Sequence, residues 1–172
     1  MNQPLARKIQ RLYQLIARDT QKLQQLNRVM QQLSEALHRC NSAEINRLIE
    51  CQQQLLQSID HQGQQRDGLL QALGFSADKT GITQLLKKLP PKIANPIVRQ
   101  WQAYLDEINA CHQLNQNNGL LMAQQQQLIN RLLSKAPHQH PNLQSPPKSS
   151  ASCWESADRR VAITTKATES IA

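Results

Sequence analysis

Aromatic residues and glycine are scarce in this 172-residue chain: Phe, Tyr and Trp together make up 3%, and there are only five glycines. A chain with so few large rings cannot fill a wide globular core, so its apolar side chains are expected to be buried along narrow seams. Glutamine is abundant instead, at about one residue in six. Because Leu, Gln, Lys, Arg and Glu lose little rotamer freedom in a helix, the composition predicts an all-α fold of long, packed helices.

Long apolar runs are also absent. No stretch of about 18 apolar residues occurs, and the N-terminal sequence lacks the apolar core of a signal peptide. We therefore expect a cytoplasmic protein without stable membrane insertion. The GxSxG, Walker, HExxH and dinucleotide-binding motifs are missing as well, so the sequence predicts no catalytic residue, no cofactor and no enzymatic activity.

Cysteine is infrequent and scattered. The four cysteines are Cys40, Cys51, Cys111 and Cys153. They share no close spacing, so reduced thiols are expected rather than a disulfide framework. His38 with Cys40, and Cys111 with His112, are candidate metal ligands, but neither pair has the ligand spacing of a tetrahedral zinc site. No metal site is predicted.

The net charge is +8 and the pI is near 9.7, which permits attraction to nucleic acid or to acidic surfaces. Lys and Arg nevertheless occur singly or in pairs, as in Arg7-Lys8 and Lys87-Lys88, and no run resembles a basic arm. A phosphate-binding stripe needs clustered cations, so solvated helical faces are the favoured interpretation and nucleic acid is not an expected partner.

The N-terminal part of the chain carries a heptad pattern, with gaps of alternately four and three residues between seam positions. These positions are Leu5, Ile9, Leu12, Ile16, Asp19, Leu23, Leu26, Met30, Leu33 and Leu37. Only Asp19 among them is polar. The spacing predicts a coiled-coil-like helix over residues 5–39.

A second helix is expected over residues 43–73. Asn41 followed by Glu44 resembles a capping box, and Gly74 suits a helix stop because a left-handed conformation costs glycine little. The short connection makes the first two helices antiparallel neighbours. Counting back from the turn places Asp19 level with Gln62 to Arg66, so we expect an Asp19–Arg66 pair, or contact with Gln62, in the seam.

Residues 75–95 are expected to form a loop with one short helix across the end of the bundle. Asn95-Pro96 then predicts the start of a third long helix over residues 96–135, since Asn caps helices and Pro fits their first position. Its heptad positions are Ile97, Trp101, Tyr104, Ile108, Cys111, Asn115, Asn118, Met122, Gln125, Ile129 and Leu132. The expected fold class is thus a long antiparallel hairpin plus a third long helix.

The segment from Asn115 to Gly119 places two amides and a glycine in the middle of the third helix. Glycine costs about 1 kcal/mol relative to alanine in a helix interior, but the heptad continues on both sides, so we expect the helix to continue. The favoured interpretation is a polar layer that sets register, with Gly119 allowing close helix approach; a direct ligand contact is the alternative.

Proline marks the end of the helical region. After Ala136 come four prolines among Ser, His and Gln, which predicts a tail that is disordered when free. Two parts are therefore expected: a helical bundle domain over residues 1–136 and a flexible tail over residues 137–172. The apolar residues of the tail that could order on a partner are Leu143, Trp154, Val161 and Ile163.

Several motifs resemble the FlgN family of flagellar type III export chaperones. They are Arg99-Gln100-Trp101-Gln102-Ala103, Leu114-Asn115-Gln116, Asn118-Gly119, Leu120-Leu121-Met122 and, upstream, Arg66 with Leu69-Leu70 and Leu73-Gly74. The resemblance covers about residues 5–143. It implies a structural or partner-binding role for Arg66, Leu70, Gly74, Trp101, Leu114, Asn115, Asn118, Gly119 and Leu121.

The function implied by this resemblance is that of a chaperone for the hook-associated proteins of the hook-filament junction, which it would deliver to components of the flagellar export apparatus. Family members use a C-terminal segment for these substrates. Pro137-His138-Gln139, with Pro141 and Leu143, resembles the start of that segment, whereas Gln144-Ser145 stand where many relatives have an aromatic residue and Gly. The alternatives are a basic coiled-coil protein that binds nucleic acid and a structural adaptor.

Overall fold

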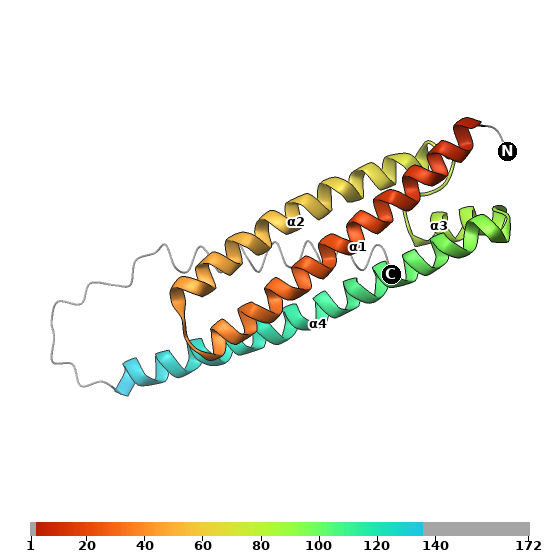
Figure 1. Ribbon diagram of the computed structural model, residues 1–172. Coiled ribbons are helices and arrows are strands. Elements are labelled where there is room, and N and C mark those ends of the chain that lie inside the picture. The colour runs from red at the N-terminus through yellow and green to blue at the C-terminus, as the bar shows by residue number, and fades with distance from the viewer. Residues whose placement is uncertain (1–2, 136–172) are drawn as a thin grey trace. The chain divides into compact units, whose positions relative to one another are not determined.

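The computed structural model describes residues 3–135, and these form helices with short connections and no strand (Figure 1). The all-α prediction is confirmed. The four helices are α1 (Gln3–His38), α2 (Ser42–Gln71), α3 (Lys79–Lys88) and α4 (Pro91–Lys135). The described residues fall into two units, one that ends at Leu121 and one that begins at Met122. The predicted domain boundary after Ala136 lies outside the described residues and stays a prediction.

The seam of α1 is the centre of the core in the first unit. Every predicted seam position from Ile9 to Leu37 is buried, Asp19 included, which confirms the heptad pattern. Leu5 is the exception: its side chain is 39% exposed, so its assignment to the seam was wrong.

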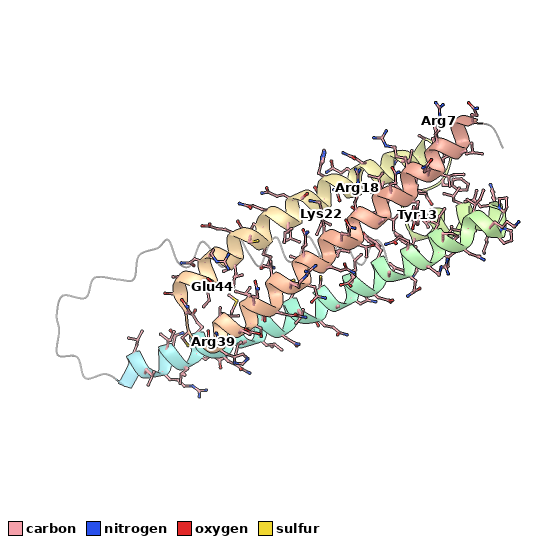
Figure 2. The ribbon with its side chains drawn as sticks, viewed as in Figure 1. Arg7, Tyr13, Arg18, Lys22, Arg39 and Glu44 are labelled. Carbon is pink, nitrogen blue, oxygen red and sulfur yellow. The ribbon has the colours of Figure 1, made fainter. Side chains whose placement is uncertain are left out.

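The turn between α1 and α2 reverses the chain as predicted. Asn41 caps α2, because its side-chain oxygen accepts a hydrogen bond from the Glu44 amide at 3.2 Å. The reciprocal half of a capping box is absent: the Asn41 amide donates to the Ala36 carbonyl, and Glu44 pairs with Arg47. Arg39 and Glu44 mark the two sides of this turn (Figure 2). The first two helices are therefore antiparallel neighbours.

The connection from α2 to α3 has a backbone conformation that requires glycine at two positions. Gly74 has a φ of 81°, as expected for the stop of α2. Asp78 caps α3 by accepting from the Gly81 amide at 2.6 Å. A Cβ at Gly81 would lie 1.9 Å from the Ser76 carbonyl oxygen, so only glycine fits this approach. Ile82 and Leu85 of α3 are buried, in agreement with the short apolar helix expected here.

The third long helix, α4, begins at Pro91 and not after Asn95. The predicted start at Pro96 was wrong, because Pro91 offers the same N-terminal signal five residues earlier. The Pro90 carbonyl accepts from Ile93 and Ala94, which forms the first turn. Ala94 and Ile97 are buried, and their packing offsets the hydrogen bond that Pro96 cannot donate inside the helix.

In the first unit, α4 runs beside α1 in the same direction (Figure 1). Gln100 bonds to Thr20, Glu107 to Asn27, and Asn118 to Met30, so residue numbers rise together along both helices. Ile97, Trp101, Tyr104 and Cys111 are buried as the heptad predicted. Within this unit, the backbone of α1 lies closer to the backbone of α2 than to that of α4. The α1–α4 interface is therefore bridged by side chains.

Among residues 3–135, no helix has the length and apolar character needed to cross a membrane. The longest helix, α4, carries polar residues throughout its centre.

Candidate functional site

A buried ion pair joins α1 to α2. The Arg66 Nη1 donates to the Asp19 Oδ2 at 2.7 Å, which confirms the predicted pair, and both side chains are almost fully excluded from solvent. Arg66 also lies 3.7 Å from Asp67. The second carboxylate oxygen of Asp19, Oδ1, and the Gln62 side-chain oxygen are both buried without a hydrogen-bond partner. The cluster is therefore polar but incompletely satisfied.

Two aromatic residues of α4 complete this cluster. Trp101 and Tyr104 stack at a centroid distance of 4.9 Å, and the Arg66 guanidinium carbon lies 5.0 Å from the Tyr104 ring centre and 5.9 Å from that of Trp101. Such contacts add cation–π attraction to the ion pair. Arg66 and Trp101, which belong to separate sequence motifs, are thus brought together by three helices.

Burial governs the protonation of Asp19. It raises the pKa of this carboxyl from 3.8 to about 6, against the opposing attraction of the Arg66 charge. Asp19 is fully buried and bonded to Arg66, an arrangement that suits helix registration.

Asn118 joins α4 to α1 through a side-chain hydrogen bond. Its side-chain amide donates to the Met30 carbonyl at 2.9 Å, while its Oδ1 is buried without a partner. Asn115, one turn earlier, is only half-buried. This arrangement supports the predicted polar layer, with Asn118 as the residue that makes the interhelical bond.

Gly119 does not allow a close helix approach. It is exposed, and a Cβ at this position meets no atom within 4 Å, so that interpretation was wrong. The heptad places Asn118 toward α1, and the next residue consequently points away from it. The remaining motif residues differ in burial: Leu70 is buried, Leu114 and Leu121 are half-buried, and Gly74 is exposed.

The C-terminal end of α4 exposes a series of apolar side chains. Exposure is 58% for Leu128, 54% for Ile129, 61% for Leu132 and 67% for Leu133. The heptad assigned Ile129 and Leu132 to a buried seam, which was wrong: heptad spacing predicts which face of a helix a residue occupies, but not whether another helix covers that face. Nothing in the sequence pattern of α4 distinguished these exposed apolar residues from those of the buried seam.

The cysteines in the described region show no metal-binding arrangement. No group of three or more His, Cys, Asp or Glu side chains suited to a metal occurs among residues 3–135. Burial raises the pKa of the Cys111 thiol to about 12, and its sulfur donates to the Leu23 carbonyl at 3.5 Å. Cys111 therefore remains a protonated core residue of the α1–α4 interface.

The predicted partner-binding residues of the tail, Leu143, Trp154, Val161 and Ile163, lie outside the described residues. Their role stays a prediction.

This helical hairpin with a parallel third helix, held by a buried polar cluster, defines an all-α protein of the coiled-coil type. Its fold is similar to a crystal structure described as a candidate flagella synthesis protein FlgN from Pseudomonas aeruginosa, with a TM-score of 0.57 and 23% identity over 69% of this chain and 93% of that one. The family model described as FlgN protein matches residues 1–142, so the chain belongs to the FlgN family and has a role in flagellum biogenesis. No curated protein matches the sequence.

Proposed function

We propose that this protein is a non-enzymatic cytoplasmic export chaperone that binds hook-associated proteins of the hook-filament junction and delivers them to the flagellar type III secretion apparatus. The observation that carries the proposal is the exposed apolar end of α4, in a chain that belongs to a flagellar family. Isolated exposed apolar side chains are common on protein surfaces, but a run of them along one helix is typical of a protein-binding surface.

The chemistry of this surface suits a helical substrate. Leu128 and Leu132 are four residues apart and Ile129 and Leu133 repeat the same spacing, so their side chains lie one turn above each other. An amphipathic helix of a substrate can bury its apolar face against such a surface. The predicted tail begins directly after this helix, so Leu143 and Trp154 can extend the contact along the same substrate.

Co-purification of co-expressed junction proteins tests this proposal. Leu128→Glu combined with Leu132→Glu should reduce substrate retention by about tenfold or more, because each buried leucine contributes about 1.5–3 kcal/mol by area burial. Gln126→Glu combined with Asn130→Glu is the matched control, since it adds the same charge to exposed positions of the same helix segment. Equal retention by both double variants would move the substrate site away from this surface.

A salt titration separates this function from nucleic-acid binding. Phosphate contacts weaken steeply as salt rises because counterions are released, whereas apolar helix capture does not. Retention of the junction proteins should therefore survive a salt increase that removes nonspecific nucleic acid. Loss of retention in parallel with nucleic acid would favour a basic coiled-coil protein.

A further inference from the structure

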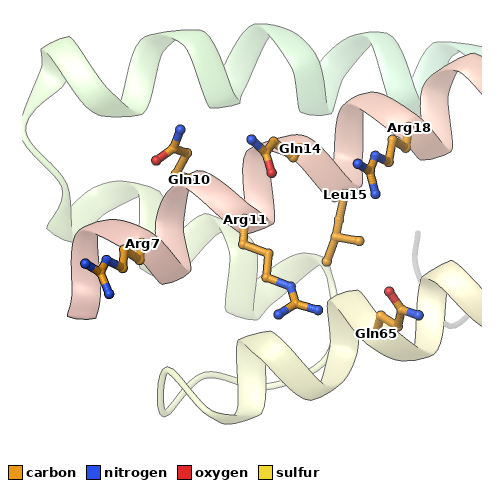
Figure 3. Close-up of a pocket in the computed structure, with 7 residues that line it drawn as sticks. All are labelled: Arg7, Gln10, Arg11, Gln14, Leu15, Arg18 and Gln65. Carbon is orange, nitrogen blue, oxygen red and sulfur yellow. The ribbon is translucent and has the colours of Figure 1, made fainter. Parts of the chain in front are cut away.

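We propose that the N-terminal half of α1 is a docking surface for an acidic segment of another protein, separate from the apolar end of α4. Arg7, Arg11 and Arg18 line one recess of about 380 Å³ between α1 and α2, together with Gln14 and Gln65 (Figure 3). Arg11 extends toward α2 in this view. The floor of the recess is the buried Leu15.

The three arginines have no carboxylate partner within the described part of the chain. Ion pairs in residues 3–135 involve Arg39, Arg47 and Arg66. The first acidic residue of the sequence is Asp19, which is buried against Arg66. The positive charge on this face is therefore uncompensated.

Helix stability does not account for this charge. None of the three arginines lies in the last turn of α1, where the helix dipole would favour a cation, and α1 has no acidic residue in its first turn. The spacing of four residues from Arg7 to Arg11 and seven from there to Arg18 places like charges along one face, which is mildly repulsive. A partner's carboxylates would relieve this repulsion.

The guanidinium groups of the recess can bind either carboxylates or phosphates, and the rest of its lining favours a polypeptide. Guanidinium groups bind carboxylates in bidentate geometry, and the amides of Gln14 and Gln65 can donate to further carboxylate or peptide oxygens. Arg7 and Arg18 are about 16 Å apart along the helix axis, which matches about three turns of a partner helix. No aromatic side chain lines the recess to stack on a base.

An apolar recess on the other side of the same helix supports a polypeptide partner. Ala6, Ile9 and Tyr13 of α1, with Ile93 and Ile97 of α4, line a space of about 300 Å³. Gln10 lines both recesses, so one segment that crosses α1 at Gln10 can place carboxylates on the arginines and an apolar side chain in this space. Such an anchor beside complementary charges is typical of protein recognition.

Fluorescence anisotropy with the full chain and a labelled glutamate-rich peptide containing one Leu-Phe pair tests the inference. Arg11→Glu combined with Arg18→Glu should weaken binding by about tenfold or more, since two charge-assisted contacts are lost and replaced by repulsion. Tyr13→Ala should weaken it by about threefold through loss of the apolar contact. The matched control is Arg28→Glu with Lys87→Glu, which changes the net charge equally at exposed positions outside both recesses.

Four outcomes overturn the inference. The first two are equal weakening of binding by the control variant and equal binding of a peptide in which every Glu is replaced by Gln. The other two are tighter binding of a DNA duplex than of the peptide, and tighter binding of vesicles containing phosphatidylserine, where the Arg11→Glu and Arg18→Glu double variant abolishes that binding. Junction-protein retention by the arginine variants should stay at the wild-type level, because the apolar end of α4 is unchanged. Peptide binding thus tests the docking surface, and junction-protein retention tests the proposed chaperone function. Either proposal can fail while the other holds.

Discussion

At the scale of single residues, the Asp19–Arg66 pair specifies how three helices meet. A buried ion pair loses much of its Coulomb attraction to desolvation, so its contribution lies more in registration than in stability. Stacking of Arg66 near Trp101 and Tyr104 adds the third helix to this arrangement. The buried Asp19 needs the Arg66 charge, and the buried Arg66 needs both the carboxylate and the two aromatic rings.

The Asp19 carboxyl should make stability depend on pH. Burial raises its pKa to about 6 in the folded chain, compared with 3.8 when exposed. The folded state then binds a proton more readily than the unfolded state between these values, so this group increases stability as pH falls, by at most about 3 kcal/mol. Urea denaturation from about pH 7 to about pH 4 should show this rise in wild type relative to Asp19→Asn. A constant difference across that range contradicts the assignment.

Replacement of Asn118 should separate stability from register. Asn118→Leu removes a buried oxygen without a partner and buries more apolar surface, so thermal stability should be kept or raised by about 1 kcal/mol. The lost bond to Met30 should allow α4 to slip against α1. Disulfide trapping between Thr20→Cys and Gln100→Cys, whose side chains are in contact in the native register, measures this slippage in a background with the native cysteines replaced by serine. Unchanged trapping would assign the register to other contacts.

Within the elements, two glycines have opposite roles. Gly81 lies in the first turn of α3, where a side chain would collide with the Ser76 backbone, whereas Gly119 lies in the interior of α4 facing open space. Glycine is therefore sterically required at position 81, whereas at position 119 it only lowers the helix propensity of α4.

Alanine substitutions at these glycines should change stability in opposite directions. Gly119→Ala should raise the free energy of unfolding by about 1 kcal/mol through helix propensity, and Gly81→Ala should lower it by about 1–3 kcal/mol because the α2–α3 connection must shift. Urea denaturation of the two variants beside wild type measures both effects. A destabilising Gly119→Ala would indicate that the exposed side of α4 has a partner.

At the scale of the whole molecule, the two proposed contact surfaces lie on different helices. The arginine recess is on α1 and the apolar series is at the end of α4. In the proposed function, the apolar series would hold the cargo and the arginine recess would take a second partner. In the proposed function, the tail after Ala136 would add apolar residues to the cargo contact.

Removal of residues 137–172 should leave the helical domain folded and greatly weaken capture of the junction proteins. The tail contributes no heptad position, so the thermal midpoint of the truncated chain should match wild type. Trp101→Phe leaves Trp154 as the only tryptophan, and its emission should shift to shorter wavelength when the full chain binds substrate. A truncated protein that melts cooperatively and retains full affinity would place the binding surface on the helices alone.

The sequence by itself determined the helices, the α1 seam and the Asp19–Arg66 pair, because heptad spacing and a short turn leave one antiparallel register. Only the tertiary structure decided that α4 starts at Pro91, since two Pro signals compete locally and burial of Ala94 favours the earlier one. It also decided that Leu132 is exposed and that scattered arginines converge on one recess. Periodicity fixes which face a residue occupies, but only the packed neighbours determine whether that face is covered.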